Sequence, residues 1–158
     1  MEKTHAYFLE KAIALSKTGM EAGKGGPFGC VIVKDGEIIG EGSNSVLDQL
    51  DPTAHAEVVA IRAACRHLQS FQLEGCTLYT SCEPCPMCLG AIYWARPEAV
   101  YYANTKADAA AIGFDDQFIY EELDKPHEGR KIPFKRLALP QAGEAFRAWA
   151  EKEDKKVY

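Results

Sequence analysis

The sequence contains no long run of apolar residues. From Met1 to Lys17, charged side chains interrupt the apolar ones, a pattern unlike the core of a secretion signal. Elsewhere no stretch approaches the roughly 20 apolar residues that a membrane-spanning helix needs. Apolar residues make up 47% of the chain and charged residues 26%, which is typical of a globular protein in water. We therefore expect a single cytoplasmic domain, residues 1–158, large enough to bury a core.

The sequence also lacks an excess of basic residues, internal repeats and low-complexity segments. Lys and Arg number 18 against 23 Asp and Glu, which gives a net charge of −5. Proteins that bind nucleic acids usually carry a basic patch, because the phosphate backbone is negative. Nucleic acid is therefore disfavoured as a partner, and no membrane partner is indicated.

Disulfide bonds are not expected, although the cysteine count of six is even. Without a secretion signal, a reducing compartment is the better interpretation, and clustered cysteines there more often bind metal. The six are Cys30, Cys65, Cys76, Cys82, Cys85 and Cys88. The last three fall at three-residue intervals, a metal-ligand spacing, and the first three are most simply small core residues.

The segment from Pro84 to Cys88 predicts the start of a helix. Pro86 is favourable at the first helical position, because its missing N–H would have no partner there. Cys85 then falls at the N-cap and Cys88 in the first turn. Both thiols lie where the helix dipole favours the thiolate, which is the form that binds metal.

A second helix start lies upstream, around His55 and Glu57. Asp51 or Thr53 is expected to cap a helix of about residues 54–67, and either choice places His55 in its first turn. Residues two apart do not share a helix face. The imidazole and the carboxylate can therefore converge only on a point beyond the N-terminal end of the helix, and we expect the metal there.

One histidine and two cysteines give three protein ligands, and three ligands plus a water are typical of catalytic zinc. Other metal and redox sites also have to be weighed. Cys82 could close a structural site with three cysteines and one histidine, but Glu57 would then have no role. An iron–sulfur cluster is disfavoured because the fourth position of its usual pattern is Ile92. A redox pair of cysteines would leave His55 and Glu57 unexplained.

The hydrophobic pattern predicts an α/β protein with a mixed five-stranded sheet and helices on both faces. An Asp-Gly pair at 35–36 predicts a hairpin. The strand–helix–strand order after residue 75 predicts a right-handed parallel crossover. Strands are expected at 28–33, 37–42, 76–80, 99–103 and 134–139, and helices at 3–22, 54–67, 86–95, in pieces over 106–122, and at 142–154.

The order His-x-Glu followed by Pro-Cys-x-x-Cys resembles the motif of zinc-dependent cytidine and nucleobase deaminases. Other segments resemble bacterial guanine deaminases within that family, and they are residues 25–29, 51–57, 79–97, 113–116 and Tyr158. The resemblance implies a cytidine deaminase-like α/β/α fold and one Zn²⁺ per chain. It also implies an enzyme of purine metabolism that hydrolyses guanine to xanthine and ammonia.

Alternative functions stay open at this point. The same chemistry could act on guanosine, cytosine or an adenosine in tRNA, and a zinc-stabilised interaction module without turnover is a different class. The resemblance also implies residue roles. His55, Cys85 and Cys88 would bind the metal, and Glu57 would be the acid–base group. Residues implied to contact the substrate are Phe28, Asn44, Ala56, Trp94, Asp116 and Tyr158, with Asp116 also assisting the departing amine.

The C-terminal part contains an apolar helix face that must be covered. Residues 126–131 form a polar connection with a proline and a glycine, and beyond it Phe146, Trp149 and Ala150 share one helix face. The resemblance implies that residues of about 132–158 are exchanged between two protomers. The expected assembly is a homodimer in which Tyr158 covers the pocket of the other chain.

Overall fold

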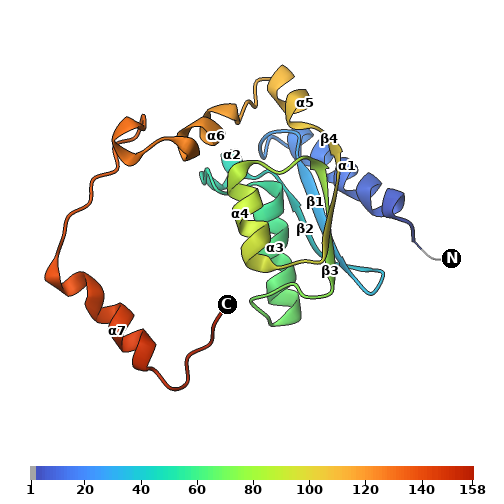
Figure 1. Cartoon of the computed structure of the whole chain (residues 1–158). Helices are drawn as coiled ribbons and strands as arrows, with labels where there is room; N and C mark the ends of the chain where they lie inside the picture. The colour runs from blue at the N-terminus through green and yellow to red at the C-terminus, as the bar shows by residue number, and fades with distance from the viewer. Residues whose placement is uncertain (1–2) are drawn as a thin grey trace. The chain divides into compact units, whose positions relative to one another are not determined.

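The computed structural model describes residues 3–158, which fall into two compact units. The first unit ends at Asp116 and the second runs from Gln117 to Tyr158. The sheet and the helices that cover it belong to the first unit (Figure 1). In the part of the chain that the structure describes, no helix is long and apolar enough to cross a membrane.

The first unit is built on a mixed sheet with the strand order β2-β1-β3-β4. Its strands are β1 (Gly29–Lys34), β2 (Glu37–Ser43), β3 (Cys76–Cys82) and β4 (Ala99–Asn104). β1 is antiparallel to both β2 and β3, whereas β3 and β4 are parallel. Asp35 and Gly36 both have positive φ, 50° and 78°, as a tight two-residue hairpin turn requires. The predicted hairpin and the parallel pairing are confirmed.

Helices cover both faces of the sheet (Figure 1). α1 (His5–Glu21) packs on one face, and α3 (Ala56–Leu68) and α4 (Pro86–Ala95) pack on the other. A short helix, α2 (Val46–Gln49), follows β2. The predicted α/β/α layers are therefore present.

Alternation along β1 explains the two cores, because successive strand side chains point to opposite faces. Cys30 and Ile32 are buried in the cluster formed with α3 and α4. Val31 and Val33 are buried in the other cluster, which contains Phe8 of α1. The sheet is thus apolar on both sides and belongs to the interior of the unit.

The prediction of a fifth strand at 134–139 is wrong, since the sheet of the described chain has four strands. Residues 133–139 carry no regular secondary structure, and Pro140 starts a 3₁₀ turn directly after them. A strand exists only where its peptide groups pair with a neighbour. This segment lies in the second unit and pairs with no strand of the described sheet.

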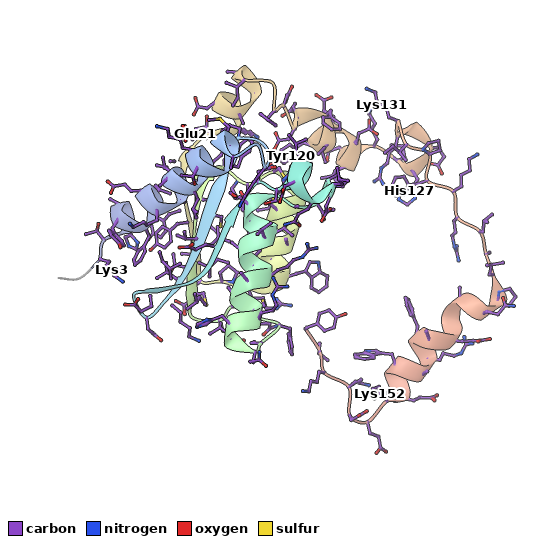
Figure 2. All side chains as sticks on the ribbon, turned by 180° about the vertical axis from the view of Figure 1, so that it is seen from behind. Lys3, Glu21, Tyr120, His127, Lys131 and Lys152 are labelled. Atoms are coloured by element: carbon purple, nitrogen blue, oxygen red, sulfur yellow. The ribbon has the colours of Figure 1, made fainter. Side chains whose placement is uncertain are left out.

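The second unit consists of short helical segments. They are α6 (Gln117–Asp124), η1 (His127–Gly129), η2 (Pro140–Gly143) and α7 (Glu144–Glu151), and α5 (Lys106–Ala111) precedes them in the first unit. The predicted helical pieces around residue 113 are confirmed, and α7 is shorter than predicted. His127 and Lys131 lie on the turn after α6 (Figure 2). No residue of α7 is buried.

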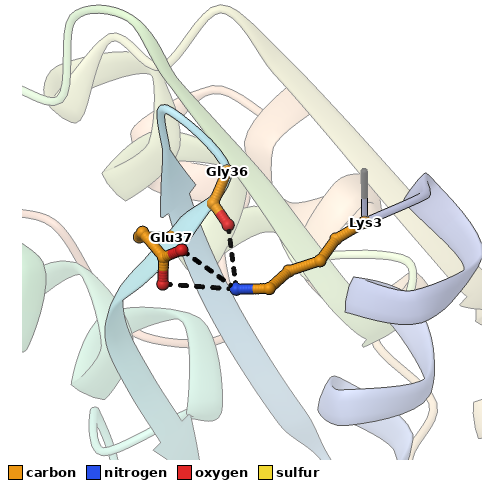
Figure 3. A network of polar contacts seen from close by, with 3 residues as sticks. All are labelled: Lys3, Gly36 and Glu37. Atoms are coloured by element: carbon orange, nitrogen blue, oxygen red, sulfur yellow. Dashed lines mark hydrogen bonds and ion pairs between the residues drawn. The ribbon is translucent and has the colours of Figure 1, made fainter. Parts of the chain in front are cut away.

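The start of α1 is tied to the β1–β2 hairpin by Lys3 (Figure 3). Its Nζ lies 3.1 Å from Glu37 Oε1 and donates to the Gly36 carbonyl at 3.3 Å. The Thr4 side chain caps the helix by accepting from the Tyr7 N–H. Exposed ion pairs contribute only about 0–1 kcal/mol, so this contact adds little to the stability of the fold.

The approach of α3 to β2 positions the functional site. Ala60 and Ala64 face the strand from the buried side of α3. A Cβ on Gly40 would lie 2.6 Å from the Ala60 carbonyl oxygen, and a Cβ on Gly42 would lie 2.4 Å from that of Ala56. Only glycine leaves room for the helix backbone at this distance. The start of α3 is therefore fixed against the sheet.

We expect Gly42→Ala to destabilise the protein by about 1–3 kcal/mol, because the added methyl forces the backbone of α3 away from the strand. Gly90→Ala is the matched control, since a Cβ at Gly90 meets nothing within 4 Å on α4. That change should be neutral or stabilise by up to about 1 kcal/mol. Chemical denaturation measures both. A Gly42→Ala protein as stable as the wild type would contradict the close-packing argument.

Candidate functional site

Two helix N-termini carry the predicted ligands. Cys85 is the N-cap of α4, with Pro86 at the first helical position, as predicted. His55 is the N-cap of α3 and has an extended backbone, with φ −68° and ψ 154°. The prediction that His55 lies inside the first turn is therefore wrong by one residue. The Asp51 side chain does not cap the helix, because it accepts from the Thr53 N–H and hydroxyl in the preceding turn.

His55, Cys85 and Cys88 are positioned to hold a metal ion. Their ligand atoms lie within 4.8 Å of one another. His55 Nδ1 is 3.5 Å from Sγ of each cysteine. Zn–S bonds of about 2.3 Å and Zn–N bonds of about 2.0–2.1 Å at tetrahedral angles put N and S about 3.6 Å apart. The donor types and their spacing therefore fit a zinc ion with a fourth position left for another ligand.

Cys82 does not complete this group among the described residues. Its thiol donates to the Thr105 carbonyl at 3.6 Å. Burial raises the pKa of Cys82 to about 11, which disfavours the thiolate that a metal needs. The geometry thus favours three protein ligands over a closed four-ligand site.

The two ligand thiols are electrostatically coupled. A hydrogen bond from Cys88 lowers the pKa of Cys85 to about 4. The same bond, together with burial, raises the pKa of the Cys88 thiol. The hydrogen bond to Cys85 raises the pKa of His55. A divalent cation held here would compensate the second negative charge, as expected for a metal centre with two thiolates.

Glu57 is a buried carboxyl beside the ligands. Its side chain is only 6% exposed. Oε1 accepts a hydrogen bond of 2.9 Å from the Thr80 hydroxyl, and Oε2 lies 3.3 Å from Cys88 Sγ. Burial raises the pKa of Glu57 above its ordinary value. A raised pKa suits a group that must both accept and return a proton near neutral pH.

Asn44 is fixed close to the end of β2 by the glycine-rich turn before β1. Its Oδ1 accepts from the Val46 N–H at 3.1 Å, so the NH₂ group is the end of the amide left to donate. A Cβ on Gly25 would lie 2.0 Å from this Oδ1. The turn therefore needs glycine at this position for the amide to keep its place.

Phe28 is half-buried and packs edge-to-face on Phe114, with the ring centroids 5.0 Å apart. A Cβ on Gly26 would lie 2.8 Å from the Phe114 ring. Phe114 belongs to the segment 113–116 that carries the family resemblance, but no role was predicted for it. The rings of Phe28 and Phe114 therefore hold each other in place in the first unit.

Asp116 ends a segment that is tied to the metal-binding loop. Asn104 accepts from the Glu83 N–H at 2.8 Å, and the Glu83 carboxylate accepts from the Lys106 N–H at 2.8 Å. These contacts join the start of α5 to the loop before Cys85. Burial, and then the charge of Cys85, raise the pKa of Asp116, so this carboxyl lies within electrostatic reach of the ligands.

The remaining predicted substrate residues are less constrained. The Ala56 side chain is fully buried, so only its backbone is available to a ligand. Trp94 is 62% exposed on α4, and Tyr158 is 63% exposed in the second unit. Their roles stay predictions.

Known proteins resemble the chain closely. The family model of the cytidine and deoxycytidylate deaminase zinc-binding region matches residues 2–104. A guanine deaminase of Bacillus subtilis is 60% identical over 98% of this chain and 99% of its own length. The solved structure of guanine deaminase from that organism has a TM-score of 0.96 at 59% identity, covering 98% of this chain and 99% of the solved one. A tRNA-specific adenosine deaminase of Aquifex aeolicus is 38% identical over 92% of this chain and 93% of its own length.

We expect purified protein to hold about one zinc ion per chain and Cys88→Ala to lose it, because two remaining ligands do not close a zinc site. Cys82→Ala is the matched control and should keep the metal, since its thiol contacts a backbone carbonyl instead. Elemental analysis of dialysed protein measures both. Full zinc in Cys88→Ala, or its loss in Cys82→Ala, would overturn the ligand assignment.

Proposed function

The chain belongs to the cytidine and deoxycytidylate deaminase zinc-binding family, and we propose that it hydrolyses guanine to xanthine and ammonia. The observation that carries the chemistry is a three-ligand metal site with a buried carboxyl beside it. The choice of guanine is supported by the likeness to the Bacillus subtilis guanine deaminase, which extends over nearly the whole of both chains.

His55, Cys85 and Cys88 would hold the zinc. When bound, zinc supplies a Lewis acid that lowers the pKa of water at its open position. The N-termini of α3 and α4 both lie at the site. Their dipoles would offset part of the negative charge of the thiolates. The positions of the two helix ends would thus reduce the net negative charge at the metal site.

Glu57 would carry protons through the reaction. It accepts one proton from the attacking water and delivers it to the ring nitrogen next to C2 of guanine. It then takes the second proton and returns it to the departing amine, so that ammonia leaves and a carbonyl forms at C2. Glu57 is again an ionised carboxylate at the end of the reaction. Its burial and raised pKa support this role.

The other site residues would hold the base. Phe28 offers a ring to stack on the purine, and the Asn44 NH₂ group can donate to an acceptor on the base edge. The backbone of Ala56 lies next to His55 and is available for a further hydrogen bond. Asp116, whose carboxyl lies within electrostatic reach of Cys85, would hold the 2-amino group and assist its departure.

A tRNA adenosine is the strongest competing substrate, because relatives named tRNA-specific adenosine deaminases match most of the chain. The net charge of −5 opposes it, since a protein that binds tRNA benefits from basic residues. Zinc and a buried carboxyl would serve either reaction, so the substrate has to be tested directly.

We expect ammonia release from guanine to exceed that from guanosine, cytosine, cytidine, adenine and tRNA under one set of conditions. Glu57→Gln is the matched control, because it keeps the shape of the side chain and removes proton transfer. It should keep zinc and lower kcat at least about 10²-fold. An enzyme-coupled ammonia assay measures this. Faster turnover of another substrate would refute guanine, and near-normal turnover by Glu57→Gln would place the base elsewhere.

We propose that the chain forms a homodimer, because the second unit exposes many apolar side chains. Its apolar side chains are largely exposed in the single chain, with Phe146 82% exposed. Others of this kind are Ile132, Phe134, Leu137, Leu139, Trp149 and Val157. An exposed apolar surface made of this many side chains is typical of a protein that contacts a partner there. A second copy of the chain can supply it by exchanging residues of about 132–158, which needs little new interaction energy. Tyr158 of one protomer would then cover the site of its partner and exclude water.

A cytoplasmic location is proposed with this assembly. All six cysteines are free in the described chain, which suits a reducing compartment.

Deleting Val157 and Tyr158 should lower activity and leave zinc in place, because the ligands lie in the first unit. Co-expression of this deletion with Glu57→Gln chains should restore part of the activity, since an intact Glu57 site then receives an intact tail. Ammonia release from a purified heterodimer measures the rescue. Its absence would show that each tail serves its own chain, and a monomer by light scattering would exclude the exchange.

A further inference from the structure

Thr80 carries a fully buried hydroxyl that no part of the proposed mechanism uses. It is 0% exposed on β3, and its Oγ1 lies 2.9 Å from Glu57 Oε1. The Gly29 carbonyl is also near, at 3.5 Å. A hydroxyl has one hydrogen to donate, and the shorter contact identifies the carboxylate as its acceptor. A buried threonine thus donates directly to the proposed acid–base group.

The strand holds this donor rigidly. Thr80 pairs with Cys30 of β1 and with Tyr102 of β4, so its backbone has a neighbour on each side. A β-branched side chain is restricted at χ1 as well. Its hydroxyl therefore has little freedom to follow the carboxylate, and the carboxylate must take its position from the hydroxyl.

The contact makes the two oxygens of Glu57 unequal. Oε1 is occupied by Thr80, whereas Oε2 faces Cys88 Sγ at 3.3 Å, on the side of the metal ligands. Oε1 can accept the same hydrogen bond whether Oε2 is ionised or protonated, because it is a carboxylate oxygen in one state and a carbonyl oxygen in the other.

We propose that Thr80 is a positioning residue that holds Oε1 of Glu57, so that Oε2 alone carries the proton during the reaction. The proposal rests on the proposed deaminase function. Thr80 neither gains nor loses a proton in it. Each proton reaches Oε2 from water and leaves from Oε2 to the substrate, while the hydroxyl hydrogen stays on Thr80.

The test compares substitutions of nearly equal size. Thr80→Val keeps the shape and removes the donor, and Thr80→Ser restores a hydroxyl without the methyl group. Ser81→Ala is the matched control on the same strand. Ser81 is 1% exposed, and its hydroxyl accepts from the Gly29 N–H. That change also deletes a buried hydroxyl, but one that does not touch Glu57. Each protein is assayed for zinc content, thermal unfolding, kcat per bound zinc and KM.

We expect Thr80→Val to lower kcat per zinc between about 10- and 100-fold, as for loss of a hydrogen bond to a charged group and of catalytic alignment. KM and zinc content should stay within about twofold, and Thr80→Ser should recover most of kcat. Ser81→Ala should lower the midpoint of thermal unfolding and leave kcat unchanged. If Thr80→Val does not fold, Thr80→Ala replaces it with the same expectation.

Two results would overturn the proposal. One is a wild-type kcat in Thr80→Val. The other is a parallel loss of stability and kcat that Thr80→Ser does not rescue, which would mean a purely structural role. Wild-type protein without activity on guanine would instead refute the proposed substrate. The Thr80 series then runs on whichever compound of the screen releases ammonia, so that the two failures are separate.

Discussion

The site depends on the convergence of two helix N-termini on one point. An N-cap residue has an extended backbone and lies at the end of its helix, so His55 and Cys85 can meet although they lie on different helices. The close packing of α3 on Gly40 and Gly42 of β2 fixes one of these ends, and Pro86 at the first helical position fixes the other. A shift of either helix by one residue would turn its ligand away. The positive ends of both helix dipoles also lie beside the thiolates.

Much of this arrangement was predictable from local pattern. The proline between the two cysteines located the start of α4, and the Asp-Gly pair located the hairpin. The start of α3 was missed by one residue because Asp51 and Thr53 have typical capping side chains, yet in the structure they bond to each other. The contact of Thr80 with Glu57 was not predicted, because strand alternation gives the face of Thr80 and not its partner.

The missing fifth strand shows the limit of such reasoning. Four of the six residues in 134–139 are apolar, and a short apolar run between turn-forming residues is consistent with a strand. An apolar run indicates what a segment would bury and does not say where a partner strand lies. Pro133 and Pro140 flank the segment and cannot donate to a ladder, which limits its pairing further. The apolar side chains of α7 have the same property, since their pattern demands a cover that the single chain does not provide.

The junction between β4 and α5 divides the proposed site residues into two groups. The residues matched by the family model end at 104, and they include the three metal ligands and Glu57. Asp116 and Tyr158, to which we assign roles in choosing and enclosing the base, both follow that point. Glu83 joins the two stretches through Asn104 and Lys106. The metal ligands and the acid–base group thus precede the junction, whereas the residues proposed to contact the base lie on both sides of it. A substitution in the second stretch can therefore alter how the base is enclosed, while the hydrogen bonds of Glu83 keep the start of α5 attached to the loop before Cys85.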